Sequence, residues 1–182
     1  MARGKSVRMV ALLRGVNVGG VTVTSAALAT MFAEEGFENV RTVLASGNVA
    51  FDAPGARDAE GLKARIESAL ERTFGYDAWI VLLARQRLAR IADAYPFPRT
   101  DGTDQPYVVF FSSAAIADEL MAEAPGLLLD VEALEAGDDV LYWRVPRGST
   151  LRTPFAKLLA KPRFKAHLTT RNLRTVEKLA TA

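Results

Sequence analysis

The sequence predicts an α+β protein made of two tandem ferredoxin-like βαββαβ units, with mainly antiparallel sheets and helices packed on one face. Three observations support this fold class. Apolar β-prone runs alternate with stretches of helical spacing, the order βαββαβ occurs twice, and 49% of the 182 residues are hydrophobic, enough for a core. The expected domains are a first unit over 1–84, a linking helix and loop over 85–106, and a second unit with a C-terminal helix over 107–182.

Hydrophobic spacing and capping residues place the elements of the first unit. The clearest is a helix in which Leu62, Ile66 and Leu70 recur at four-residue spacing, with Asp58 as its N-cap and Gly75 as its end. The expected elements are, in chain order, a strand at 7–13, a helix near 25–35, a hairpin of 40–44 and 49–51, the helix between 58 and 75, and a strand at 78–84. Thr24 or Ser25 can cap the helix near 25–35, and Gly36 is placed to end it.

The second unit repeats this order of elements. Thr153 and Pro154 fit the N-cap and first position of a helix. No residue-by-residue identity accompanies the repeat, so the duplication is inferred from element order alone. The expected elements are a linking helix near 86–95, a strand at 107–112, a helix at 114–124, strands at 127–134 and 139–146, a helix at 154–160, a short strand at 164–169 and a last helix at 173–180.

The same spacing predicts which side chains form the two cores. Those expected to be buried in the first unit are Leu12, Leu28, Phe32, Val43, Leu62, Ile66, Leu70 and Ile80, and in the second unit Val109, Leu120, Leu141 and Leu158.

Composition excludes several kinds of site. The chain has no cysteine and one histidine, which rules out disulfides, thiolate nucleophiles, and cysteine-ligated or multi-histidine metal sites, so no metal and no cofactor are expected. No apolar run approaches the roughly 20 residues that span a bilayer. The apolar run before Arg14 is also too short for a signal peptide. We therefore expect a soluble, cytoplasmic protein with no membrane partner.

The net charge of +2 is distributed unevenly along the chain. Residues 1–14 contain four basic residues and no acid, and residues 144–182 contain ten basic residues and the single acid Glu177, which leaves a net charge of −11 for residues 15–143. Such asymmetry can accompany nucleic-acid binding, but a basic tail can also pack against an acidic middle. The sequence leaves both interpretations, and the oligomeric state, open.

Arg14 ends the first apolar run, in the segment MVALLRGVNVGG (9–20). A guanidinium can hold a carboxylate or phosphate through two parallel hydrogen bonds. In a ferredoxin-like topology the third strand lies beside the first, so the turn at 46–48 should meet the end of the first strand. We therefore expect a small anionic ligand, nucleotide-like or phosphorylated, at this edge of the first sheet. The candidate ligand-binding residues there are Arg14, Gly15, Asn17, Gly19, Gly20, Ser46, Gly47 and Asn48.

Ordinary turn chemistry is the alternative for these residues. Glycines serve turns with positive φ, asparagines bond to local backbone, and Arg14 could pair with a protein carboxylate. Neither of the phosphate-binding patterns G-x-x-x-x-G-K-[ST] and G-x-G-x-x-G occurs in the chain.

A second candidate segment, TTRNLRTVEKL, precedes and forms the last predicted helix. Thr170 and Asn172 can accept backbone N–H groups there, which is typical of a helix cap. Arg171 stands at a helix N-terminus, where the helix dipole favours anions rather than cations. Thr170, Arg171 and Asn172 are therefore weaker candidates for contact with an anionic ligand.

Two further functions are possible from the sequence. One is an enzyme, although no pair of nucleophile and base can be identified, so no reaction is assigned. The other is a nucleic-acid-associated protein that uses the basic C-terminal region. RNA-binding modules of this topology carry aromatic residues on the third strand, whereas the equivalent segment SGNVAF has Asn48 and Ala50 at the positions of the stacking rings, which weakens that interpretation.

Three of the segments above carry a resemblance to a known family. ALLRGVNVGG, GFENVRTVLASGNVAF and TTRNLRTVEKL resemble, in the same order, hallmark segments of the domain-of-unknown-function 1697 family. Val16 and Ala50 replace commoner aliphatic residues, and Leu173 stands where a tryptophan is usual. The resemblance implies an α+β fold of repeated βαβ elements and, as the family's name says, no established activity.

Overall fold

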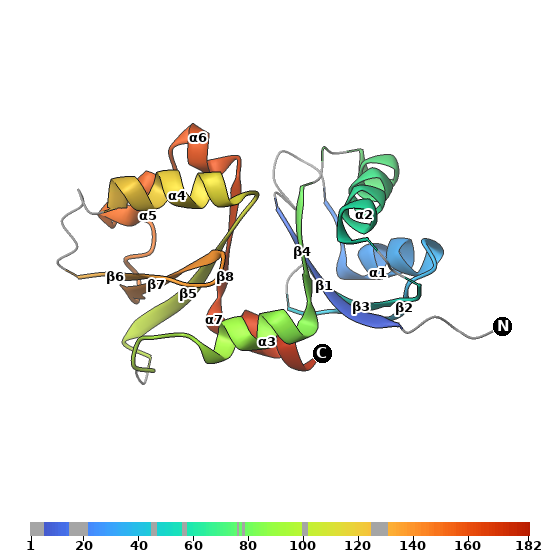
Figure 1. Ribbon diagram of the computed structural model, residues 1–182, viewed down its shortest axis with the longest axis horizontal. Helices are drawn as coiled ribbons and strands as arrows, with labels where there is room; N and C mark the ends of the chain where they lie inside the picture. The colour runs from blue at the N-terminus through green and yellow to red at the C-terminus, as the bar shows by residue number, and fades with distance from the viewer. Residues whose placement is uncertain are drawn as a thin grey trace. The chain divides into compact units, whose positions relative to one another are not determined.

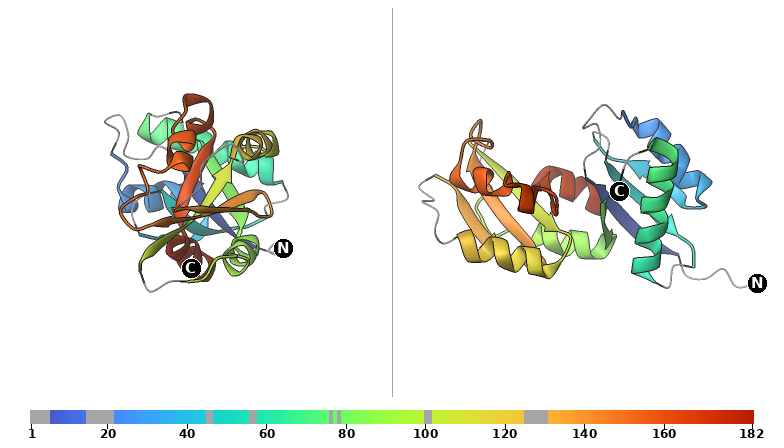
Figure 2. Two further views of the ribbon diagram at one scale, coloured as in Figure 1. Left: turned by 90° about the vertical axis from the view of Figure 1, so that its left-hand side faces the viewer. Right: turned by 90° about the horizontal axis from the view of Figure 1, so that it is seen from above.

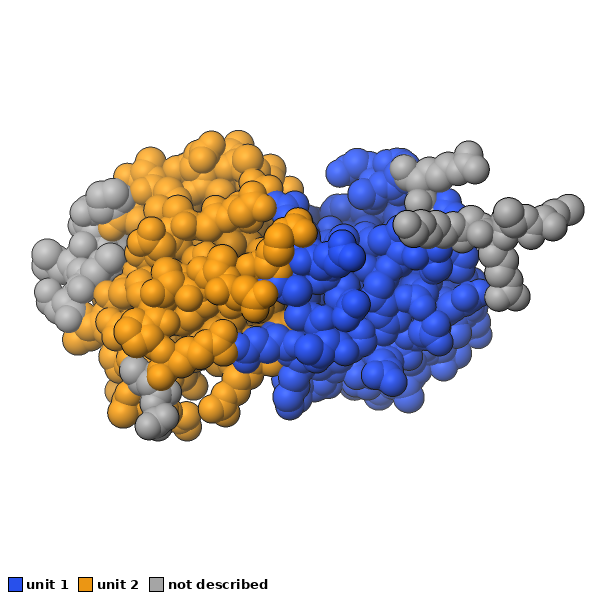
Figure 3. Space-filling view, turned by 60° about the horizontal axis from the view of Figure 1, so that its bottom comes forward, with its two compact units in different colours: residues 1–89, 177–182 blue, residues 90–176 orange. Residues whose placement is uncertain are grey.

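The computed structural model describes residues 6–14, 22–44, 47–55, 58–75, 77, 79–99, 102–124 and 131–182. In these residues the strands form two four-stranded antiparallel sheets, and helices connect strands along the chain, so the protein is mixed α+β (Figure 1). The chain divides into two compact units, of which unit 1 comprises residues 1–89 and 177–182 and unit 2 comprises residues 90–176 (Figure 3).

The sheet of unit 1 has the strand order β2-β3-β1-β4, and every pairing in it is antiparallel. Strand β1 is central and pairs with β3 on one side and β4 on the other. The elements are β1 (Val7–Leu13), α1 (Ser25–Glu34), β2 (Glu38–Thr42), β3 (Asn48–Ala53), α2 (Ala59–Phe74) and β4 (Ile80–Ala84), followed by α3 (Arg85–Asp93).

The caps of α1 and α2 are those expected from the sequence. The Thr24 side chain accepts a hydrogen bond from the Ala27 N–H at 3.1 Å. The Asp58 carboxylate accepts from two N–H groups in the first turn of α2. Gly75 ends α2 with a φ of 67°, in the left-handed region that glycine adopts without strain.

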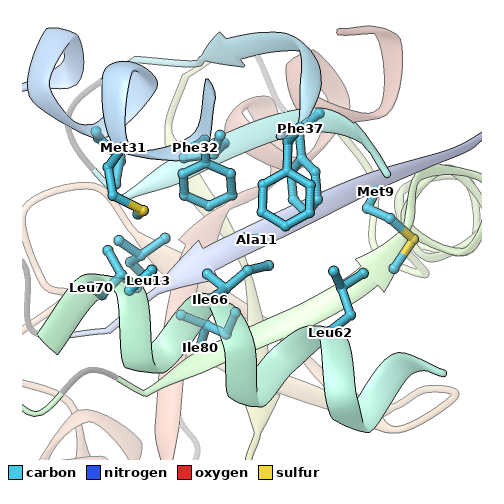
Figure 4. Close-up of a cluster of buried hydrophobic side chains, with 14 of the residues drawn as sticks. Met9, Ala11, Leu13, Met31, Phe32, Phe37, Leu62, Ile66, Leu70 and Ile80 are labelled. Carbon is cyan, nitrogen blue, oxygen red and sulfur yellow. The ribbon is translucent and has the colours of Figure 1, made fainter. Parts of the chain in front are cut away.

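Helices α1 and α2 cover one face of the first sheet (Figures 1 and 2). Alternate residues of β1, which are Met9, Ala11 and Leu13, point toward these helices because successive side chains of a strand face opposite sides. Figure 4 shows Ala11 and Leu13 between the labelled side chains of α1 and α2, and Met9 near Leu62 of α2. The rings of Phe32 and Phe51 lie 5.0 Å apart at their centroids and pack with that of Phe37. This cluster is the core of unit 1.

The sheet of unit 2 has the order β6-β7-β5-β8, again with antiparallel pairing throughout. Residues from α4, α5 and α6 pack on one of its faces and form a second core around Trp143. The elements are β5 (Asp104–Phe111), α4 (Ala114–Glu123), β6 (Ala133–Ala136), β7 (Val140–Pro146), α5 (Pro154–Leu159), α6 (Pro162–Lys165) and β8 (Leu168–Asn172). They are followed by α7 (Leu173–Thr181), of which residues 177–181 belong to unit 1.

Every side chain expected in the two cores is buried except Val43. Val43 is half-buried because it follows the last residue of β2, a strand at the edge of the sheet. Its backbone N–H donates to the Asn48 carbonyl and closes the hairpin between β2 and β3. The expected burial of Val43 was therefore wrong.

The strand expected over 127–134 is displaced in the structure. Strand β6 begins only at Ala133, and neither Val131 nor Glu132 belongs to it. Residues 125–130 lie outside the described residues. Glu132 therefore lies outside the strand, and its side chain is buried in the core of unit 2.

The short strand expected over 164–169 was also misplaced. Pro162 starts the helical turn α6, in which proline suits the first position, and Phe164 points into the core from that turn. Strand β8 begins at Leu168 and continues to Asn172.

Glu132 is a buried carboxylate that joins three parts of unit 2, and its residue is only 3% exposed. Its Oε2 accepts a hydrogen bond from the Trp143 indole N–H at 2.8 Å, and its Oε1 accepts from the Phe155 N–H in the first turn of α5 at 2.9 Å. Each oxygen thus accepts from a buried N–H group that has given up its hydrogen bond to water on folding.

Asp52 links β3 to both neighbouring strands of unit 1. It lies opposite Arg8 in the β1–β3 ladder, and the Arg8 guanidinium donates to its Oδ1 at 3.2 Å. Its Oδ2 accepts from the Asn39 side-chain amide at 2.6 Å. The Asn39 hydrogen bond, together with the charge and hydrogen bond of Arg8, lowers the pKa of Asp52 against the opposing effect of burial.

We expect Asp52→Asn to lower the free energy of unfolding at pH 7 by about 1–2 kcal/mol, since it removes a charge-assisted hydrogen bond that is partly exposed. A carboxyl with a lowered pKa contributes stability above the pKa of the unfolded chain and loses it as the pH falls. The difference between variant and wild type should therefore shrink below about pH 4. Urea denaturation at pH 7 and at about pH 2.5, well below the ordinary pKa of an aspartate, measures it.

Asp118→Asn, on the exposed surface of α4, is the control for the Asp52 measurement. It should change the unfolding free energy by less than about 0.5 kcal/mol. A destabilisation of Asp52→Asn that is equal at the two pH values would contradict an ionic contribution of Asp52.

We expect Glu132→Gln to destabilise the protein by about 1–3 kcal/mol, because glutamine has one acceptor oxygen and leaves one buried N–H without a partner. Chemical denaturation followed by tryptophan fluorescence measures the change. The exposed Glu135→Gln in β6 is the matched control. Equal stability of Glu132→Gln and wild type would show that the two hydrogen bonds contribute little.

Candidate functional site

The end of β1 lies beside the start of β3, as the expected topology requires. The Leu13 N–H donates to the Gly47 carbonyl at 2.7 Å, and the Arg14 N–H donates to the Trp79 carbonyl, just before β4, at 3.0 Å. The backbone of Arg14 is thus fixed at a point where three strands of the first sheet begin or end. Its side chain is half-buried.

The turn that faces Arg14 is organised by Asn48 and Gly47. Asn48 is buried at 6% exposure, and its side-chain amide donates to the Val43 carbonyl at 3.2 Å. Gly47 has a φ of 104°, which favours glycine over any residue with a side chain. These two residues therefore do at least what ordinary turn chemistry predicts for them, since they shape the hairpin between β2 and β3.

The remaining residues of this predicted site are Gly15, Asn17, Gly19, Gly20 and Ser46, and they lie outside the described residues. Their part in a site stays a prediction. Among the described candidates of unit 1, the structure brings together Arg14, Gly47 and Asn48.

The C-terminal candidates Thr170, Arg171 and Asn172 belong to β8 of unit 2. The Arg171 guanidinium donates to the Thr169 hydroxyl at 2.7 Å and to the Thr170 carbonyl at 3.0 Å. Burial lowers the pKa of Arg171 to about 10. Its side chain therefore turns back onto its own strand.

Asn172 has the capping role expected of it. Its Oδ1 accepts a hydrogen bond from the Arg174 N–H at 3.0 Å, in the first turn of α7. Thr170 lies two residues earlier, in the strand rather than at the helix start. The expected strand ended at 169, whereas β8 continues to Asn172 and runs directly into α7.

Several basic side chains of the C-terminal region pair with acids of α4. Lys161 lies 3.1 Å from the Glu123 carboxylate, and Arg163 contacts both Glu119 and Glu123. The Lys161 hydrogen bond and the charges of both bases lower the pKa of Glu123. Part of the basic tail thus packs against the acidic middle of the chain, as one of the two interpretations of the charge asymmetry predicts.

One polar pocket of unit 1 was missed by sequence reasoning. It has a volume of about 620 Å³ and lies at the start of β1, the opposite end from Arg14. Its lining residues are Arg8, Asn39, Val40, Arg41, Asp52, Arg85 and Ala182. The opposite charges of Arg8 and Asp52 were visible in the sequence, but only the strand register places them across from each other.

Two negative findings apply to the described part of the chain. No group of three or more His, Asp or Glu side chains there is arranged to hold a metal ion. None of the helices described there has both the length and the apolar character needed to cross a membrane.

Comparison with known proteins places the fold. The structure is similar to that of a conserved bacterial protein, SP0830, from Streptococcus pneumoniae, with a TM-score of 0.81, 24% sequence identity, and coverage of 97% of this chain and 98% of that one. An unknown protein from Galdieria sulphuraria matches with a TM-score of 0.26 and 15% identity over 92% of this chain and 98% of its own. The first likeness shows a shared fold.

Comparison by sequence identifies a family whose activity is unknown. No curated protein matches the chain. The model of a family described as "Protein of unknown function (DUF1697)" matches residues 7–142, which is well over half of the chain. The match includes β1 and the hairpin of β2 and β3, the segments that carried the resemblance in the N-terminal half. The chain therefore belongs to the DUF1697 family.

Proposed function

We propose that the protein binds a small anionic ligand, nucleotide-like or otherwise phosphorylated, at the edge of the first sheet where β1 ends. The observation that carries the proposal is the hydrogen bond from the Leu13 N–H to the Gly47 carbonyl at 2.7 Å. It supports a common site for Arg14 and the 46–48 turn, which lie more than thirty residues apart in sequence.

Arg14 is the residue that binds the anionic group of the ligand in this proposal. A guanidinium can bind a phosphate or carboxylate through two parallel hydrogen bonds. The backbone bond from Arg14 to Trp79 supports this role, because it fixes the start of the side chain and reduces the entropy lost when a ligand is held.

Gly47 and Asn48 act in this proposal by shaping the site. The buried Asn48 amide holds the hairpin closed, and the positive φ of Gly47 turns its carbonyl toward β1. Asn17, Ser46 and the glycines 15, 19 and 20 would supply directional hydrogen bonds and close backbone approach to the ligand.

We also propose that each unit is a ferredoxin-like βαββαβ unit and that the two arose by duplication. The orders β2-β3-β1-β4 and β6-β7-β5-β8 support this, because they place corresponding strands in the same positions and pair all of them antiparallel. This topology supports a site at the end of the first strand of unit 1, because it brings the start of β3 beside it.

Nucleic-acid binding through the basic C-terminal region is less well supported than a small ligand. Lys161 and Arg163 are paired with acids of α4, and Arg171 is engaged with its own strand. Binding to a phosphate backbone needs basic side chains that can exchange counterions for phosphates.

The test is a thermal-shift screen of nucleotides and phosphosugars against the wild-type protein and Arg14→Ala. A ligand at 100 times its dissociation constant should add about 2.7 kcal/mol of stability to the wild type. We expect Arg14→Ala to abolish this ligand-induced shift while the melting temperature of the free protein stays close to that of wild type.

Arg152→Ala, an exposed arginine of unit 2, is the matched control and should retain the full shift. If Arg14 instead serves the fold as the partner of a buried carboxylate, its removal should destabilise the free protein by about 3–5 kcal/mol. That result, or a shift that Arg14→Ala retains, would overturn the proposed function.

A further inference from the structure

The polar pocket at the start of β1 contains more hydrogen-bond donors than acceptors. Arginines come from three elements, Arg8 from β1, Arg41 from β2 and Arg85 from the start of α3, and Asp52 is the one carboxylate side chain among the lining residues. All of the lining residues belong to unit 1. The side chains of the pocket thus carry a net positive charge.

Both oxygens of the Asp52 carboxylate are already engaged. Arg8 donates to Oδ1 and the Asn39 amide donates to Oδ2. The Asn39 carbonyl is occupied as well, since it accepts from Arg8 at 2.8 Å. The Asp52 carboxylate is thus engaged by Arg8 and Asn39, and neither Arg41 nor Arg85 forms a hydrogen bond to it.

Arg41 and Arg85 retain unused donors. Within the part of the chain that the structure describes, the Arg41 side chain forms no hydrogen bond or ion pair. The buried Nε of Arg85 also has no hydrogen-bond partner there, although its Nη1 donates to the Ala180 carbonyl at 3.1 Å. A buried N–H without an acceptor has lost its hydrogen bond to water, and an acceptor bound in the pocket would restore that hydrogen bond.

Two of the positive charges lie side by side where β1 begins and β4 ends. The β1–β4 ladder ends at the pair of Met9 and Ala84, and Arg8 and Arg85 are the residues that adjoin this pair. Like charges opposite each other destabilise a sheet. Oxygens of Ala180 and Ala182 accept from the two arginines and offset part of this repulsion. An anion between the guanidinium groups would offset more.

We propose that this pocket is a second anion site, which takes a small oxyanion of the phosphate-ester or pyrophosphate class. Arg41 and Arg85 supply the open donors, and Arg8, held by Asp52, adds its charge. The fork of N–H groups on a guanidinium matches the geometry of phosphate oxygens. The site is separate from the one proposed at Arg14 and does not rest on it, because the two lie at opposite ends of β1.

Isothermal titration calorimetry with inorganic pyrophosphate tests the pocket, using the full chain at an ionic strength of about 0.05 M, where charges are weakly screened. We expect saturable binding of one pyrophosphate to this site. Arg41→Gln removes an exposed side chain without partners, so the fold should be unaffected, and binding should weaken by about tenfold or more. Arg152→Gln is the matched control and should change the affinity less than about twofold.

The same titration in Arg14→Ala separates the two sites. Binding that persists in Arg14→Ala and is lost in the double variant with Arg41→Gln belongs to the pocket, whatever becomes of the function proposed at Arg14. The Nε–Hε signal of Arg85 in a nitrogen–proton NMR spectrum should shift with pyrophosphate in the same concentration range. The proposal is overturned if the wild type shows no saturable binding, if Arg41→Gln binds as tightly as wild type, or if Arg14→Ala alone removes all binding.

Discussion

Strand β1 is hydrogen-bonded along both of its edges, to β3 and to β4. This double pairing fixes the positions of the core residues of β1 and of the arginines at its two ends. Alternate residues of β1 are committed to the core under α1 and α2. Arginines stand at its two ends, Arg8 near the start and Arg14 just past the finish. A strand rises about 3.3 Å per residue, so the two arginines lie roughly 20 Å apart along it and cannot hold the same small ligand.

Two carboxylates show how differently one chemical group can be used. Glu132 is enclosed in the core of unit 2, where its oxygens accept from an indole and a backbone amide, both neutral donors. Asp52 lies at the edge of the core of unit 1 and accepts from a guanidinium and a side-chain amide. Glu132 therefore organises packing between a strand and a helix, whereas Asp52 orients a charge at the surface.

The sequence predicted the elements of unit 1 well because its local signals agree with the tertiary structure. Asp58, Gly75 and the four-residue spacing of Leu62 and Ile66 all point to one helix, and the structure has it. Caps act over three or four residues, so a single sequence contains all the information they need. The neighbourhood of Leu13 and Gly47 could likewise be inferred, since it follows from strand order alone.

The prediction failed where distant contacts decide local conformation. The apolar residues before Glu132 suggested a strand, but Glu132 itself is held by Trp143 and Phe155, and the strand starts after it. In Pro162-Arg163-Phe164 the helical turn was missed because four residues are too few to show a period.

The pocket at the start of β1 could not be inferred from the sequence either. It depends on the strand register and on a shift of the β2–β3 pairing between Glu38 and Arg41. Neither can be read from residue types alone.

The shift in the β2–β3 pairing also affects how readily the protein can aggregate through the edge of its first sheet. Strand β2 is at the margin of its sheet, with unpaired backbone groups that another chain could use to extend the sheet. Asn39 has a φ of 50°, in the left-handed region, and so breaks the regular ladder in the middle of this strand. Exposed charges at Glu38 and Arg41 flank the break. The break in the β2–β3 ladder, which forms one wall of the pocket, therefore also makes the edge strand β2 a poor template for aggregation.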